Sequence, residues 1–301
     1  MSNKPTTQHE WTIHSINIHG VFFERWCQQV IEDKRGWELY RTNFPVACPP
    51  PMKDGLETRE SALDVRAVWY GSFGSINLVI ECKKNNPEYV DWIFFEKPRR
   101  GLTLFRAIET IPTRSQPPSQ SRFFFAYPLR DLLVADEARE TRSFYQSYSD
   151  QKKDKTKTSN AAITDAARQV ALAAQAVVYQ DYLSEKQRTK APDLRQVYAF
   201  VPVILTTAHL FLCSFDPKDV NADTGEIPYD KAALKEVPYL IYEFPLPYHL
   251  QSTHLYANKA DINALELEAH LRMHIFVVHS ERFIEFLDYI GRNVEYFFMS
   301  S

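Results

Sequence analysis

The chain has 301 residues, 45% of them hydrophobic and 14% aromatic, so it can bury a large core and is not a disordered polypeptide. Its formal net charge of −3 excludes general electrostatic attraction to nucleic acid, so any nucleic-acid surface has to be local. With eight glycines and neither a Gly-x-x-x-x-Gly-Lys nor a Gly-x-Gly-x-x-Gly motif, the sequence offers no cradle for a nucleotide.

The amino-terminal segment and the cysteines indicate a cellular compartment. Residues 1–8 lack the apolar centre of a signal peptide, and no stretch approaches the ~20 apolar residues of a membrane span. Cys27, Cys48, Cys82 and Cys213 show no paired spacing, which favours free thiols over disulfides or a zinc site. We therefore expect a cytoplasmic protein with no membrane contact.

The first predicted helix covers residues 18–32, because apolar side chains recur there at helical spacing. Glu24 lies at one edge of the apolar face that this spacing creates. Residues 37–40 then suit a strand, and the proline-rich residues 42–59 are predicted to form a loop.

A β-hairpin is predicted for residues 63–83, where two β-rich runs flank the turn sequence Gly-Ser-Phe-Gly. Alternate residues of a strand share a face, so Glu81 and Lys83 point the same way. The hairpin brings Asp64 near Glu81, although the two are far apart in the sequence.

Two converging carboxylates repel each other unless a cation neutralises them. Mg²⁺ prefers one or two carboxylates completed by water and phosphate oxygens. Asp64 and Glu81 therefore indicate a magnesium site, with Mn²⁺ as a substitute, suited to phosphodiester cleavage. Lys83 would orient the attacking water or neutralise charge on phosphorus.

The span from residue 86 to about 155 is too long for a connection and is predicted to be an insertion with structure of its own. Between residues 97 and 130, basic residues outnumber acids and aromatic residues are interleaved, which suits nucleic-acid contact. The candidate contacts are Arg99, Arg100, Arg106 and Arg122. The alternative is a buried strand at residues 123–127 with arginines at its solvated ends.

A long helix is predicted for residues 161–187, which contain no glycine or proline. Gln175 and Tyr179 lie four residues apart on one face of it. Two strands follow at residues 196–205 and 209–215.

The C-terminal part begins with a proline-rich stretch after residue 216. It ends with an apolar strand at residues 273–279 and an amphipathic helix at residues 280–298, for which Ser280 is the predicted N-cap.

Asp64 followed by Glu81-Cys82-Lys83 resembles the PD-(D/E)XK motif of restriction-endonuclease-like nucleases, with Leu63 in place of the usual proline. In many such nucleases a helix before the first core strand supplies another acidic metal ligand, a role that falls here to Glu24.

The long helix extends the resemblance. Gln175 and Tyr179 are similar to the Q-x-x-x-Y element of the RecB and lambda-exonuclease branch, which makes Gln175 a candidate positioning residue.

The resemblance implies an α/β protein with a restriction-endonuclease-like core, that is, a central mixed sheet flanked by helices. The nuclease core would span residues 1–215, including the insertion at about 86–155, and residues 216–301 would form an α/β extension that packs on the core or makes an interface.

The expected activity is Mg²⁺-dependent hydrolysis of DNA in restriction, anti-phage defence or repair. The expected partners are DNA and a helicase, an ATPase or a sensor protein, with a homo-oligomer as a further option. Two alternatives stay open: a non-catalytic nucleic-acid-binding or assembly subunit, and an RNA-directed nuclease.

Overall fold

The computed structural model describes eleven stretches of the chain: residues 7–18, 20–47, 60–85, 90–97, 103, 105–111, 120–126, 132–141, 160–186, 194–247 and 271–293. The helices are α1 (Gln8–Ile18), α2 (Val21–Asp33), α4 (Ala161–Lys186) and α6 (Phe283–Arg292), with the 3-10 turns η1 (Pro217–Asp219) and η5 (Ser280–Arg282). The strands before α4 are β1 (Trp37–Ala47), β2 (Glu60–Gly71), β3 (Gly74–Lys83), β4 (Asp91–Glu96), β5 (Phe105–Ile111), β6 (Gln120–Ala126) and β7 (Val134–Thr141). Those after α4 are β8 (Gln196–Thr206), β9 (His209–Phe215), β10 (Ala232–Glu236), β11 (Tyr239–Pro245) and β12 (Arg272–His279).

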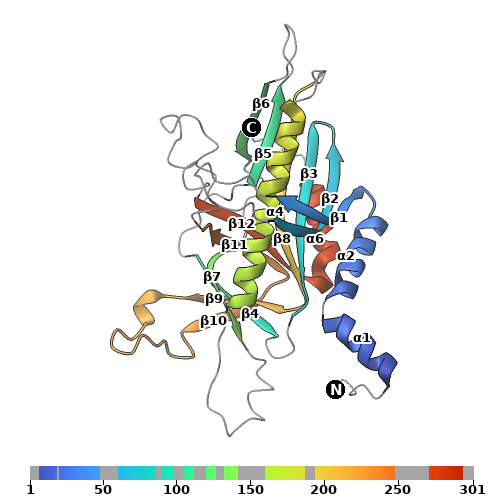
Figure 1. Ribbon diagram of the computed structural model, residues 1–301. Helices are drawn as coiled ribbons and strands as arrows, with labels where there is room; N and C mark the ends of the chain where they lie inside the picture. Colours follow the sequence, from blue (N-terminus) through green and yellow to red (C-terminus); the bar gives the residue numbers. More distant parts are fainter. Residues whose placement is uncertain are drawn as a thin grey trace, which may run out of the picture.

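All the described strands join one mixed sheet (Figure 1). Its main path runs β1-β2-β3-β8-β12-β11-β7-β4-β9-β10, and β5 and β6 branch from β8. The first three strands are antiparallel neighbours, whereas β3, β8 and β12 run parallel to one another. The predicted α/β class, a mixed sheet flanked by helices, is therefore confirmed.

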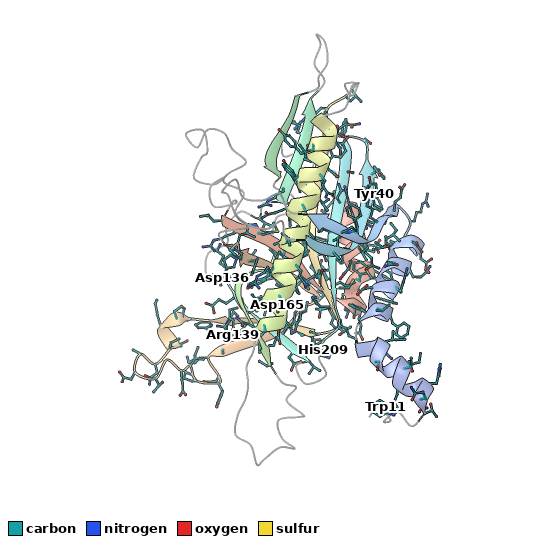
Figure 2. The ribbon with its side chains drawn as sticks, in the orientation of Figure 1. Trp11, Tyr40, Asp136, Arg139, Asp165 and His209 are labelled. Atoms are coloured by element: carbon teal, nitrogen blue, oxygen red, sulfur yellow. The ribbon has the colours of Figure 1, made fainter. Side chains whose placement is uncertain are left out.

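Two apolar layers hold helices on opposite faces of the sheet. The small side chains of α4, from Ile163 to Val178, pack on Val79, Phe200 and Ile204. On the other face α2 and α6 cover the alternate residues of the same strands, among them Leu78. α1 extends beyond α2, away from the sheet, and its Trp11 is 52% exposed (Figures 1 and 2). None of the described helices is both long and apolar enough to cross a membrane.

The predicted hairpin is present, and its turn is fixed by a close approach of β8. Gly74 has φ 152°, and a Cβ at this position would lie 1.7 Å from the Val197 carbonyl oxygen. The Val197 backbone N–H donates to the Phe73 carbonyl at 2.9 Å. Only glycine fits where the turn meets β8 so closely.

Two predicted boundaries are wrong. β1 continues through Pro45 to Ala47 instead of giving way to a loop at residue 42, because β1 is an edge strand, where a proline is tolerated. The last helix begins at Phe283 with Arg282 as its N-cap, and Ser280 instead begins the preceding 3-10 turn. His279 caps that turn, because its Nδ1 accepts the Glu281 backbone N–H. α6 ends at Arg292, and residues 294–298 lie outside the described ranges.

The inserted and C-terminal segments both contribute to the main sheet. β4 and β7, from the predicted insertion, pair with β9 and β11. β12, near the end of the chain, lies between β8 and β11. These pairings bring segments that are far apart in the sequence together in one sheet.

Candidate active site

The candidate site forms at the carboxyl end of β3. The parallel register of β3 and β8 runs from Gly74 opposite Val197 to Lys83 opposite Thr206. β12 continues the row on the far side of β8, with His279 opposite Thr206. Three parallel strands therefore end at one edge of the sheet, which is where ligands bind in open α/β sheets.

Asp64 reaches this edge because β2 and β3 separate there. Their pairing ends with Val65 opposite Ile80. Beyond that pair, Asp64 Oδ2 accepts a hydrogen bond from the Cys82 backbone N–H at 2.8 Å. A carboxylate thus takes the place of a ladder carbonyl at the end of β3.

Glu81 and Lys83 form an ion pair on one face of β3, as the alternation of the strand requires. The Lys83 Nζ lies 2.7 Å from Glu81 Oε1. The Glu81 side chain is 5% exposed, whereas that of Lys83 is 29% exposed. The carboxylate is therefore buried, and the ammonium reaches solvent.

A third carboxylate comes from α2. The thiol of Cys82 is hydrogen-bonded to that of Cys27, which holds α2 against β3. Glu24 lies almost one turn earlier and is half-buried. Burial and then the charge of Asp64 raise the pKa of Glu24, and Lys83 lowers it. The pKa of Glu24 therefore depends on the charges of the Asp64 and Lys83 side chains.

The charges in this cluster do not balance. Burial, then Asp64 and Glu24, raises the pKa of Glu81 to about 7, although Lys83 opposes the shift. Burial also raises the pKa of Asp64, against the Cys82 backbone hydrogen bond and the charge of Lys83. Lys83 is thus the cation paired with Glu81, and it does not prevent a pKa that leaves Glu81 partly protonated at neutral pH.

The donor set fits magnesium. Within the described ranges, no three His, Cys, Asp or Glu side chains already surround one point as metal ligands would. Magnesium needs only one or two carboxylates, because water and phosphate oxygens complete its shell. Asp64 and Glu81 would be this pair, and a divalent cation would reduce the repulsion and burial cost that raise the pKa of Glu81.

Three buried side-chain N–H groups have no hydrogen-bond partner in the part of the chain that the structure describes: Gln28 Nε2, Asn85 Nδ2 and Trp92 Nε1. Two of them flank the site, because Gln28 follows Glu24 by one helical turn and Asn85 follows Lys83 by two residues. Buried N–H groups are normally paired. The sequence argument missed Gln28 and Asn85, although the spacing of four residues from Glu24 is a signal for Gln28.

α4 carries Gln175 half-buried between two attachments to the sheet. The Ile163 backbone N–H donates to Glu140 of β7, and Asp181 pairs with Arg66 of β2. Gln175 lies between these points, on the helix that packs on β2 and β3. Its role as a positioning residue stays a prediction.

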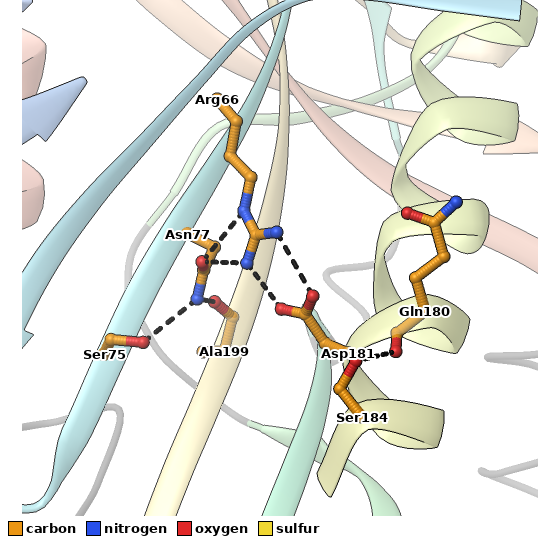
Figure 3. Close-up of polar contacts among 7 residues, drawn as sticks. All are labelled: Arg66, Ser75, Asn77, Gln180, Asp181, Ser184 and Ala199. Atoms are coloured by element: carbon orange, nitrogen blue, oxygen red, sulfur yellow. Dashed lines mark hydrogen bonds and ion pairs between the residues drawn. The ribbon is translucent and has the colours of Figure 1, made fainter. Parts of the chain in front are cut away.

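A buried arginine ties α4 to the hairpin (Figure 3). Arg66 is 7% exposed and donates to Asn77 Oδ1 at 3.2 and 2.6 Å. It also donates to both carboxylate oxygens of Asp181, at 3.2 and 2.5 Å, and the Tyr40 ring lies 4.5 Å from its guanidinium carbon. Arg66 is two residues from Asp64 on β2, so the network anchors the strand that presents this carboxylate.

The described contacts do not bring the arginines predicted to contact nucleic acid to this edge of the sheet. Arg99 and Arg100 lie outside the described residues, and only the backbone of Arg122 is described, in β6. Arg106 is half-buried on β5, opposite Phe200 in the middle of β8.

No protein-family model matches the chain, and comparisons with curated proteins and with solved structures find no similar protein. The function is therefore argued from the chemistry of the site.

Proposed function

We propose that the protein is a Mg²⁺-dependent nuclease that hydrolyses phosphodiester bonds in DNA. The observation that carries the proposal is the convergence of Asp64, Glu81 and Lys83 at the end of β3, with one lysine opposing more than one buried carboxylate. Strongly perturbed acids at a strand end are typical of functional sites. A divalent cation would relieve the burial cost and the repulsion that raise the pKa of Glu81.

Asp64 and Glu81 would hold the metal, and Glu24 would complete or tune its surroundings. A bound Mg²⁺ would lower the pKa of a coordinated water and supply a positive charge for the reacting phosphate. Lys83, already paired with Glu81 and still partly exposed, would hold the attacking water or the charge that develops on phosphorus.

The arrangement of the elements supports the same proposal. α2 precedes three antiparallel strands, and α4 then leads to β8 parallel to β3. This order is expected of the PD-(D/E)XK nucleases that the motif resembles, and we propose that residues from α2 to β9 form a restriction-endonuclease-like core. The strands β4 to β7 are additions to that order.

The test is cleavage of linear, circular and single-stranded DNA, with an RNA control, in Mg²⁺, Mn²⁺ or EDTA. Wild type is compared with Asp64→Asn and Lys83→Met, and with Asp165→Asn, which removes an exposed carboxylate of α4 (Figure 2). We expect metal-dependent cleavage that falls at least about a hundredfold in the first two variants and is unchanged in Asp165→Asn.

Equal activity in wild type and Asp64→Asn would overturn the proposed site. DNA binding without cleavage in any metal would favour the non-catalytic binding subunit. Cleavage of RNA alone would change the substrate and keep the site.

A further inference from the structure

Arg25 and Gln28 form a polar pair on α2, next to the carboxylate cluster. The Arg25 Nη1 donates to Gln28 Oε1 at 3.0 Å. Arg25 is exposed, whereas Gln28 is 6% exposed and lies among the buried residues of the helix. The buried amide of Gln28 therefore fixes the exposed guanidinium of Arg25 through this hydrogen bond.

The amide leaves a hydrogen-bonding group unused. Gln28 Nε2 is buried and has no partner in the described residues. An unpaired buried N–H costs about 1–3 kcal/mol, so an apolar side chain at position 28 would give a more stable helix packing. Among the described contacts, the hydrogen bond from Arg25 is the one that uses a polar side chain at position 28.

A neutral partner also leaves Arg25 its charge. A glutamate at position 28 would accept the same hydrogen bond and neutralise the guanidinium. Gln28 fixes the guanidinium while leaving its positive charge and most of its N–H donors available to an anion. This is what a phosphate-binding arginine requires, because a guanidinium binds phosphate in a bidentate, planar geometry.

The position of Arg25 indicates which kind of anion it would bind. It follows Glu24 directly on α2, the helix that packs on β2 and β3, so the guanidinium lies on the element next to the acidic cluster. A substrate phosphate held by Asp64 and Glu81 through a metal would have its neighbouring phosphates within reach of this part of α2. A small acidic metabolite would need no second cation outside the metal site.

We propose that Arg25 binds a backbone phosphate next to the scissile bond and that Gln28 positions its guanidinium. The inference rests on the proposed function and names the substrate class of the same site, a polyanionic nucleic-acid backbone. Arg25 is a substrate-binding residue and Gln28 a positioning residue.

The test compares Arg25→Met, Arg25→Lys and Gln28→Glu with Arg35→Met, which removes an exposed arginine about 15 Å away, just past the other end of α2. KM and kcat are measured for DNA cleavage in Mg²⁺. The Kd for a 20-nucleotide DNA is measured in EDTA, in the Asp64→Asn background, as a function of salt. Thermal unfolding checks that each variant is folded.

We expect Arg25→Met to raise KM and Kd at least about tenfold, with kcat changed much less, and to reduce the salt dependence of binding by about one counterion. Arg25→Lys should retain part of the affinity, because lysine keeps the positive charge but lacks the planar pair of N–H donors that binds phosphate in a bidentate way. Gln28→Glu should raise KM without lowering the melting temperature. Arg35→Met should match wild type.

Equal KM, Kd and salt dependence in Arg25→Met and Arg35→Met would overturn the inference and leave an ordinary helix-surface pair. Lost DNA binding in Arg25→Met with no cleavage by wild type would support the phosphate site and reject the nuclease. Cleavage by wild type with an unchanged KM in Arg25→Met would support the nuclease and reject the phosphate site.

Discussion

Two buried glutamates of the same sheet have opposite surroundings. Glu81 on β3 and Glu243 on β11 have side chains only 5% and 3% exposed. Glu243 is paired with Lys97 of the β4 end and Arg272 of β12, and His274 Nε2 lies 3.7 Å from its Oε2. Glu81 has a single cation, Lys83, among the described contacts.

The pKa values follow these surroundings. Burial alone would raise the pKa of Glu243, but hydrogen bonds from His274 and Lys97 outweigh it and lower the value to about 2. Burial and Asp64 raise the pKa of Glu81 to about 7 despite Lys83. The protein neutralises Glu243 with its own cations, which is a structural use of charge, whereas Lys83 does not offset the burial of Glu81 and the charge of Asp64.

The largest expected effect is on stability. Glu243→Ala would leave Lys97, Arg272 and His274 without their shared carboxylate, so we expect it to lower the free energy of unfolding by about 3 kcal/mol. Glu81→Gln at pH 8 without metal should cost less than about 1 kcal/mol or stabilise the fold, because it removes an unfavourable charge. Urea denaturation measures both, and equal losses would remove the contrast between the two sites.

The contributions of Glu81 and Glu243 to stability should change with pH in opposite directions. The folded pKa of Glu81 lies above its ordinary value of 4.5, so its contribution is complete below pH 4.5 and is lost as pH rises through about 7. In EDTA, we expect wild type to lose about 3 kcal/mol relative to Glu81→Gln between pH 4.5 and 8. The folded pKa of Glu243 lies below 4.5, so its contribution is lost as pH falls from 4.5 towards 2.

These profiles are read from urea titrations at several pH values. Parallel curves for wild type and Glu81→Gln would show that Glu81 is not the group that titrates near neutral pH.

The smallest effect belongs to the network of Arg66. Its guanidinium is paired by Asp181, so this charge is also neutralised within the protein, but the Asp181 side chain is 32% exposed. We expect Asp181→Asn to lower the free energy of unfolding by about 1 kcal/mol. The loss should be the same with and without Mg²⁺, and a loss that Mg²⁺ reverses would assign the network to the metal site.

The arrangement of the candidate residues was predictable from local patterns, whereas the pairing of distant strands was not. Strand alternation places Glu81 beside Lys83, and the hairpin places Asp64 at the end of the same strand. Helical spacing places Glu24 at the edge of the apolar face of α2, where the charges of Asp64 and Lys83 act on it. The Glu243 cluster was missed because its partners come from β4 and β12, and long-range strand pairing leaves no local signal. The predicted loop at residue 42 failed for the related reason that Pro45 is acceptable only on an edge strand.

We propose that the Glu81 cluster binds a divalent cation and that the Glu243 cluster does not. Isothermal titration calorimetry at pH 7, with Mn²⁺ added to wild type, Asp64→Asn and Glu243→Gln, distinguishes the two clusters. We expect binding to wild type with release of about half a proton per ion, because the pKa of Glu81 is about 7. Binding should be lost in Asp64→Asn and kept in Glu243→Gln. Identical binding in wild type and Asp64→Asn, or none in wild type, would contradict it.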